Sequence, residues 1–340
     1  MVTKRTLVKT MGIVFALLAL FGGLAAAQSS SDYFKGKRIT LILPNSPSGH
    51  MTQYARMIAP YIQKHLGAAD VHIKNMQGAG GVLGANYLWH AKPDGLTIAF
   101  TSVPALVLAQ LSGSTGVEFD ATKFIYLGRA ATEPRVLVVG GKSKIKTIQD
   151  VQNLGRPFVF PSQGTDEDFY TMAVLADALH FPLKPVTGYQ GNSDTTLAVI
   201  KGEGDGHITA WHSSLPGIKS GDLRPILIIG SQREPSYPNV PTALEVTQGK
   251  GKATVQAIVN MIEMHRSFFG PPGMPQAAVT ALRDGIWAAL QDPGLQAESK
   301  KTGLFLVPMK GSVEQPKVEQ IAAAGQAIVP ILKQAVAKLK

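Results

Sequence analysis

Several residue types and motifs are missing from this 340-residue chain, and each absence narrows its function. There is no cysteine, so the chain has neither disulfides nor a cysteine that could carry a lipid. It also lacks an HExxH pair, a GxxxxGKS/T phosphate loop and a GxSxG nucleophile elbow. These absences argue against a metal site, nucleoside triphosphate binding and serine hydrolase chemistry. We therefore expect no metal, no cofactor and no enzymatic activity.

Aromatic residues make up only 7% of the chain, and few of them lie among its basic residues. The positive charges are scattered, without the basic stripe that nucleic-acid binding requires. A diffuse positive field is compatible with attracting small anions. We expect a small-molecule partner and no nucleic acid.

Long apolar runs are missing except at the N-terminus, where residues 11–24 follow the cations Lys4, Arg5 and Lys9. This run is shorter than the roughly 20 residues that span a membrane, and Ala25, Ala26 and Ala27 follow it as a typical cleavage site. Residues 1–27 are therefore predicted to be a cleavable signal peptide, with an uncleaved anchor as the alternative. Removing its three cations lowers the formal net charge from +10 to +7.

The chain is organised around residues 38–66. A short apolar run at 39–43 predicts a buried strand, and residues 45–49 supply a loop of asparagine, serine, proline and glycine. Apolar residues then recur at helical spacing up to Leu66, and Gly67 follows as a stop. Such a unit points backbone N–H groups and the positive end of a helix dipole at an anion, although an ordinary α/β connection has the same pattern.

Strand and helix signals alternate along the rest of the chain, which predicts an α/β fold with mainly parallel sheets. The glycine loop at 78–84 resembles a dinucleotide fingerprint with one residue too many, so we interpret it as a tight turn. Residues 161–165 repeat the strand–loop–helix pattern. There the acids Asp166, Glu167 and Asp168 start the helix and would repel a carboxylate placed near them.

Short motifs are spread along nearly the whole mature chain. They are ARxxAPxxxxxLG at 55–67, NMQGAGG at 75–81, AKPDG at 91–95, FPSQGT at 160–165, GEGDG at 202–206, LRPIL at 223–227, PNVPT at 238–242 and FGPPGMP at 269–275. In this order the motifs resemble those of the Bug-type periplasmic solute-binding receptors of tripartite tricarboxylate transporters, the TctC-like family.

The resemblance implies a two-lobed periplasmic-binding-protein clamshell of type II-like architecture, each lobe a mainly parallel sheet flanked by helices. Residues 28–127 and 231–340 would form the first lobe and residues 128–230 the second, with crossings near Gly128 and Gly230. Such a receptor works in the periplasm, and we expect a monomer.

The resemblance also implies that a small organic acid is held between the lobes by loop N–H groups and hydroxyls. The contacts carried over by position are Ser48, Gly49, His50, Thr101, Ser102, Ser162, Gly164, Thr165 and Trp211, the last as a wall. The first loop departs from the family pattern, because consecutive glycines are replaced and His50 adds a titratable donor.

Met51 stands where the family has a polar residue, and Tyr54, Tyr189 and Trp211 are expected near the ligand. These residues favour an aromatic or otherwise apolar carboxylate over citrate. Delivery to the membrane subunits of a tripartite transporter is the expected role. A ligand sensor without transport and an exported hydrolase are the alternatives.

Overall fold

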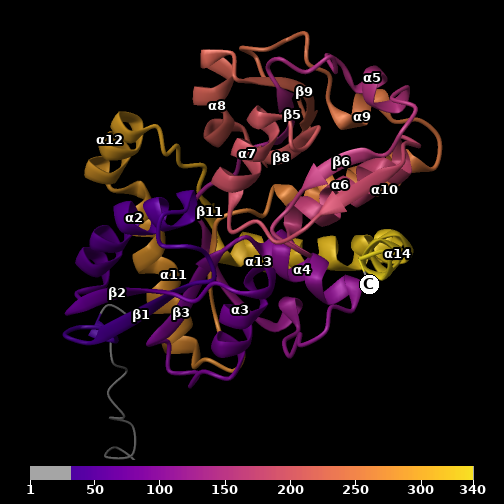
Figure 1. Ribbon diagram of the computed structural model, residues 1–340. Coiled ribbons are helices and arrows are strands. Elements are labelled where there is room, and N and C mark those ends of the chain that lie inside the picture. Colours follow the sequence, from indigo (N-terminus) through magenta and orange to yellow (C-terminus); the bar gives the residue numbers. More distant parts are fainter. Residues whose placement is uncertain (1–31, 340) are drawn as a thin grey trace, which may run out of the picture.

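The computed structural model describes residues 32–339, and the predicted signal peptide lies outside them. Two lobes of strands and helices are joined side by side (Figure 1). No helix of residues 32–339 is long and apolar enough to cross a membrane.

Within residues 32–339, the first lobe is built on a six-stranded sheet in the order β11-β4-β10-β3-β1-β2. Its strands are β1 (Arg38–Leu43), β2 (Asp70–Asn75), β3 (Thr97–Thr101), β4 (Ile125–Arg129), β10 (Ser267–Gly270) and β11 (Met309–Lys310). Its helices are α2 (His50–Leu66), η2 (Ala79–Gly81), α3 (Val82–Trp89), α4 (Val103–Ser112), η3 (Ala121–Lys123), α11 (Gln276–Gln291), α12 (Pro293–Thr302), α13 (Gly311–Ala324), η4 (Gly325–Ile328) and α14 (Val329–Ala337).

The second lobe contains, within the same residues, a three-stranded sheet in the order β8-β5-β9 and the pair β6-β7. Its strands are β5 (Arg135–Gly140), β6 (Phe158–Pro161), β7 (Leu183–Val186), β8 (Gly206–Ala210) and β9 (Leu223–Ile229). Its helices are α5 (Ile148–Gln152), α6 (Glu167–Ala178), α7 (Asn192–Lys201), α8 (Trp211–Ser220), α9 (Ala243–Val246) and α10 (Gly251–Ile262).

Strand β1 shows why the first sheet forms. Alternate side chains of a strand point to opposite faces, so Leu41 and Leu43 pack in the core under α2 and α11. Ile42, between them, packs in the core on the other face, with Val82 of α3 and Val103 of α4. Both faces are therefore buried, as the continuous apolar run predicts.

The two-lobed α/β fold predicted from the sequence is confirmed, and its sheets contain antiparallel strand pairs beside the parallel ones. Strand β1 pairs in parallel with β2 and β3, whereas β10 is antiparallel to β3 and β4. Strand β5 is antiparallel to both β8 and β9. The reason is topological, because a strand that arrives from the other lobe enters at the junction and runs away from it. Hydrophobic patterns reveal strands but not the direction of their partners.

The first crossing, residues 130–134, joins β4 to β5 close to the predicted position near Gly128. The predicted return near Gly230 is less simple, because the Ile228 N–H donates to the Pro241 carbonyl at 2.9 Å and holds the segment after Gly230 beside β9. A Cβ at Gly230 would lie 2.9 Å from Pro134 of the first crossing, so this glycine reflects close packing. We propose residues 263–266, between α10 and β10, as the second crossing.

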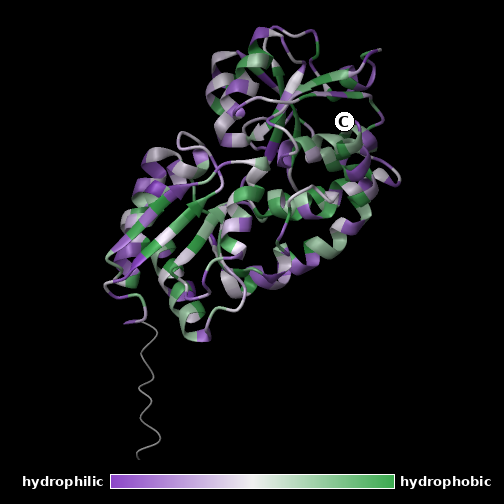
Figure 2. Cartoon of the chain, turned by 60° about the horizontal axis from the view of Figure 1, so that its bottom comes forward, coloured by the Kyte–Doolittle hydropathy of each residue, from purple (hydrophilic) through white to green (hydrophobic). Residues whose placement is uncertain are grey.

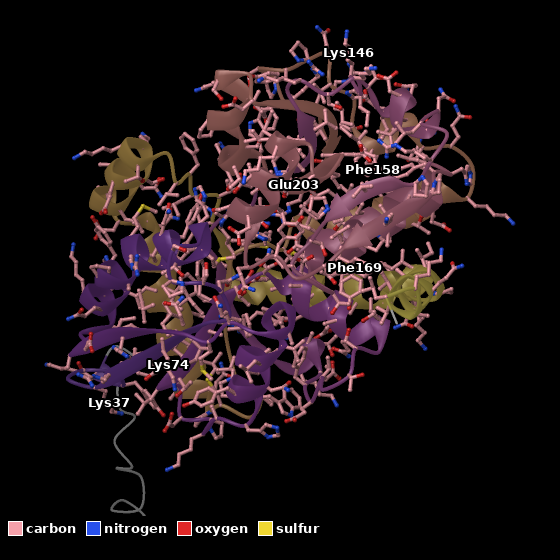
Figure 3. All side chains as sticks on the ribbon, in the orientation of Figure 1. Lys37, Lys74, Lys146, Phe158, Phe169 and Glu203 are labelled. Carbon is pink, nitrogen blue, oxygen red and sulfur yellow. The ribbon has the colours of Figure 1, made fainter. Side chains whose placement is uncertain are left out.

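Helices of both lobes share one hydrophobic core. It joins Leu106 of α4 to Phe169 of α6, Ile258 of α10 and Leu332 of α14. Figure 2 shows green, hydrophobic helix segments where the lobes meet, and Figure 3 places Phe169 beside α14. The Tyr170 hydroxyl, 2.9 Å from the Ser112 hydroxyl, adds a buried polar contact between α6 and α4.

Candidate functional site

The junction between the lobes collects the ends of several strands. Thr101, the last residue of β3, pairs with Ser267 at the start of β10, and Ser267 pairs with Arg129 at the end of β4. In the second lobe Arg135, at the start of β5, pairs with Ala210, the last residue of β8. Loops after β1, β3, β6 and β8 therefore lie along the junction, where ligands of open α/β sheets bind.

The first of these loops ends in a helix start with free donors. Gly49 caps α2 in an extended conformation, without a side-chain hydrogen bond. The Thr52 and Gln53 N–H groups donate to the Gly49 carbonyl, and those of His50 and Met51, the first two of the helix, are available to an anion. Ser48 is exposed and His50 half-buried. Burial, followed by the nearby Arg266 charge, lowers the pKa of His50, so its imidazole is neutral at pH 7.

This loop is held in place from below. Thr101 donates its hydroxyl to the Asn45 side-chain oxygen at 3.1 Å. Asn75 donates to the Asn45 carbonyl at 2.8 Å and to the Thr52 hydroxyl at 2.9 Å. Thr52 in turn donates to the Ser46 carbonyl at 2.7 Å. The side chains of β2, β3 and α2 therefore fix the shape of the loop before any ligand binds.

Two contacts close the lobes over this loop. His50 Nδ1 lies 3.0 Å from the Ser213 hydroxyl of α8 in the second lobe. A Cβ at Gly80 would lie 3.0 Å from the Thr165 carbonyl oxygen, so the first-lobe turn at η2 touches the second-lobe loop directly. Gly80 also has φ +65°, a left-handed conformation that favours glycine. The junction is therefore in a closed arrangement.

The start of α6 presents acids in place of free donors. Asp166 caps the helix by accepting the Phe169 N–H at 2.9 Å. Glu167 accepts the Ser102 hydroxyl from the first lobe, and Asp168 accepts a hydrogen bond from Arg135. Glu167, Asp168 and Arg135 are each less than a tenth exposed. Three carboxyl groups thus share the single Arg135 charge in their own lobe.

The ionisation of these groups follows from burial. Burial raises the pKa of Asp166 and Asp168, while for Glu167 the Arg135 charge and the Ser102 hydrogen bond help to outweigh burial and lower the pKa. His265, with Nε2 3.6 Å from Glu167, is itself buried, and this lowers its pKa to about 3. His265 is therefore neutral at pH 7 and adds no charge to offset the acids.

A second charged cluster lies where the two crossings meet. Glu133 of the first crossing forms an ion pair with Arg266 of the second, and accepts the His212 N–H at 2.8 Å at the start of α8. Burial alone would raise the pKa of Glu133, but Arg266 and the His212 hydrogen bonds hold it below its usual range. Arg266 also lies over the Tyr54 ring, 4.5 Å from its centroid. A protein carboxylate therefore already occupies the start of α8.

Several predicted contact hydroxyls are engaged within the protein. Thr101 supports Asn45, and Ser102 bonds to Glu167 while capping α4 through the Ala105 N–H. Ser162 donates to the Gly164 carbonyl at 2.9 Å. These residues do lie at the junction, but their hydroxyls shape the loops. Ser48, Gly49, His50, Gly164 and Thr165 are the predicted contacts that are partly or fully exposed there.

The prediction that Trp211 forms a ligand wall does not fit the structure. Trp211 is 2% exposed and packs in the second-lobe core with Val136, Ile228 and Tyr237, at 5.2 Å between the ring centroids of Trp211 and Tyr237. It follows a strand end, as expected, but its side chain points to the core. Tyr54 is also 2% exposed, so neither ring offers a face to a ligand.

Sequence reasoning found His50, Ser102 and Thr165 but missed other residues that make contacts at the junction of the lobes. Ser213 lies in an amphipathic helix with nothing to mark it, and Glu133 and Arg266 become neighbours only through the fold. Arg135 did carry a signal, because a charged residue opens a strand that is otherwise fully apolar. The acids at 166–168 were noticed in the sequence, but their partner was not.

Other features of the described residues lie away from this junction. One cavity of about 310 Å³ lies between α6, β7 and α14, and another of about 640 Å³ lies over α3. Within residues 32–339, no group of His, Asp and Glu is arranged to hold a metal ion.

Comparisons with known proteins agree with this architecture. The family described as "Tripartite tricarboxylate transporter family receptor" matches residues 54–328. The chain is 29% identical over 315 residues to the "UPF0065 protein in gbd 5'region" of Cupriavidus necator, covering 88% of each chain.

Solved structures show the same fold. The periplasmic binding protein BugD is similar with a TM-score of 0.70 at 20% identity, covering 88% of this chain and 97% of that one. MatC from Rhodopseudomonas palustris, with bound malate, is similar with a TM-score of 0.71 at 20% identity, covering 86% and 99%.

Proposed function

This chain belongs to the tripartite tricarboxylate transporter receptor family, and from that premise we propose that it captures a small organic carboxylate between its lobes. In this proposal it delivers the ligand to the membrane subunits of a tripartite transporter, works as a monomer and catalyses no reaction. The predicted signal peptide supports a periplasmic location.

The observation that carries the proposal is the start of α2. It has backbone donors without a side-chain cap, a first turn of His, Met, Thr and Gln, and a loop fixed by three side chains beneath it, Thr52, Asn75 and Thr101. Backbone N–H groups at a helix start bind carboxylates well, because the helix dipole adds to the hydrogen bonds. We propose that one ligand carboxylate binds here, with Ser48 as a hydroxyl donor and Thr165 opposite.

The body of the ligand is proposed to be aromatic or otherwise apolar. Tyr189 supports this, because it is half-buried and its N–H donates to the Ser162 carbonyl at 3.4 Å, which places it beside the second-lobe loop. Tyr54 and Trp211 give no such support, since both are buried. A thermal-shift panel tests the point: benzoate-type acids should raise the melting temperature more than citrate, and the reverse order would contradict it.

Closure of the lobes is the proposed signal to the transporter. The His50–Ser213 and Gly80–Thr165 contacts belong to the closed arrangement, and a ligand that bridges the same loops would favour it. The partner would then recognise the closed form.

Calorimetry on two variants tests the site. Ser48→Ala and Thr165→Ala should each weaken binding of a stabilising carboxylate by about 1.5–3 kcal/mol, the value of a hydrogen bond to a charged group. Ser220→Ala, at the far end of α8, is the control and should bind as the unmodified protein does. Unchanged affinity in both site variants would show that the ligand binds elsewhere.

A further inference from the structure

The starts of α2 and α6 lie in different lobes at the junction and differ in charge, and this difference constrains a ligand that reaches both. At α2 the first turn contains no carboxylate side chain. The Thr52 and Gln53 N–H groups donate to the Gly49 carbonyl, which leaves those of His50 and Met51 for a ligand. At α6 the first turn contains Asp166, Glu167 and Asp168. A ligand that bridges the lobes meets donors at one end and acids at the other.

The acids are not fully compensated. Counting both charged clusters, Arg135 and Arg266 face four carboxyl groups, and the ionised Glu133 is already paired with Arg266. His265 is neutral at pH 7, so it does not alter the balance. Glu167 Oε1 is buried 3.6 Å from Arg135 Nε, too far for a hydrogen bond, so the arginine holds Glu167 only loosely.

Ser102 shows the consequence most directly. Its hydroxyl, predicted to bind a ligand carboxylate, donates across the lobes to Glu167. A second ligand carboxylate placed at Ser102 would touch the Glu167 carboxylate and lose this donor. At a separation of about 6 Å, two like charges near a protein surface repel strongly enough to weaken binding on the order of 100-fold.

We propose that the ligand is a monocarboxylate, bound by its carboxylate at the start of α2 with an uncharged or cationic far end toward α6. This rests on the proposed function, since it describes the ligand of that same site. Asp166 is the residue that sets the discrimination against a second carboxylate. It is half-buried, and its Cα would lie 3.4 Å from a Cβ at Gly80 of the first lobe.

Calorimetry with acids of matched length tests the proposal. Hexanoate and 6-aminohexanoate should bind at least about tenfold more tightly than adipate, and benzoate should exceed terephthalate in the same way. The 6-aminohexanoate arm tells charge repulsion from a general preference for apolar ligands. An apolar junction would reject its ammonium group as it rejects the second carboxylate of adipate, whereas the acids at α6 would accept it.

Asp166→Asn removes the charge and keeps the helix cap, because asparagine caps as well as aspartate. This variant should narrow the gap between the affinities for adipate and hexanoate several-fold, by tightening adipate binding and leaving hexanoate binding unchanged. Asp120→Asn is the matched control, since Asp120 caps η3 at the far end of α4 from Ser102 and carries the same charge. It should leave the discrimination intact, and Glu167→Gln provides a second test if Asp166→Asn does not fold.

The outcomes separate this inference from the proposed function. If the dicarboxylates bind as tightly as the monocarboxylates, or if Asp166→Asn weakens both equally, the inference is wrong and carboxylate binding stands. If none of the five acids binds the unmodified protein, the proposed function itself fails.

Discussion

The loops before α2 and α6 each follow a strand and lead into a helix at the junction, yet the polar groups of the two helix starts are hydrogen-bonded in different ways. At α2 the loop is fixed by neutral side chains beneath it, which leaves the helix start open. At α6 the protein's own acids cap the helix and bond to Arg135 and Ser102. The α2 loop leaves its helix start open, whereas the acids at the start of α6 are engaged by Arg135 and by Ser102 of the other lobe.

Outside the junction the positive charges are spread over the surface. Lys37 and Lys74 lie at the outer end of the first lobe and Lys146 at the outer end of the second (Figure 3). The net positive charge of the chain therefore says little about the electrostatic environment of the junction, which is set by helix ends and buried acids.

The largest expected effect that tests this comparison of the α2 and α6 loops is a loss of folding stability when Arg135 is replaced. Arg135→Met should lower the free energy of unfolding by roughly 3–5 kcal/mol, because it leaves the buried Glu167 and Asp168 without their counter-charge. Arg38→Met is the control, since the Arg38–Asp70 pair is exposed and worth at most about 1 kcal/mol. Urea denaturation measures both, and equal small losses would mean that α6 does not depend on Arg135.

Trp211→Ala should cause a stability loss of similar size, roughly 3–5 kcal/mol, because it empties a packed core position. Its effect on affinity should be the same for benzoate and hexanoate. A selective loss of benzoate binding at unchanged stability would restore Trp211 as a ligand wall.

Ser102→Ala sharpens the contrast between the two loops. It removes the α4 cap and a donor to Glu167, so unfolding should become easier by about 1–2 kcal/mol. Ser48→Ala should leave stability unchanged, because the Ser48 side chain is exposed. If the two variants behave alike in denaturation, the loops do not differ as described.

The smallest expected effect is on the pH dependence of the free energy of unfolding. Burial raises the pKa of Asp166 to about 6 in the folded protein, above its value in the unfolded chain. A raised pKa means that this group destabilises folding as pH rises from about 4 through 6, by about 1–2 kcal/mol given its partial exposure. Asp166→Asn should flatten the stability curve in that window, and an unchanged curve would show that Asp166 titrates normally.

Much of the fold could be predicted because it depends on local patterns. The apolar run at 39–43, the helical spacing up to Leu66 and the left-handed stop at Gly67 all appear in the structure. The position of the second crossing could not be predicted, because Gly230 is required by packing against Pro134, a residue distant in sequence.

The ligand contacts stay a prediction, but their surroundings show what a sequence can and cannot reveal. The loops at 48–50 and 164–165 each follow a strand and precede a helix, as the sequence pattern indicates. Which hydroxyls are free depends on partners from other elements, such as Glu167 for Ser102. The side-chain direction of Trp211 depends likewise on the packing of the second lobe.

The most direct test of carboxylate capture is mass spectrometry of the mature protein, purified natively from its own periplasm and then denatured to release its ligand. We expect a small monocarboxylic acid in the released fraction. A released solute without a carboxyl group would contradict carboxylate capture, as would an empty protein that no carboxylate of the thermal-shift panel stabilises.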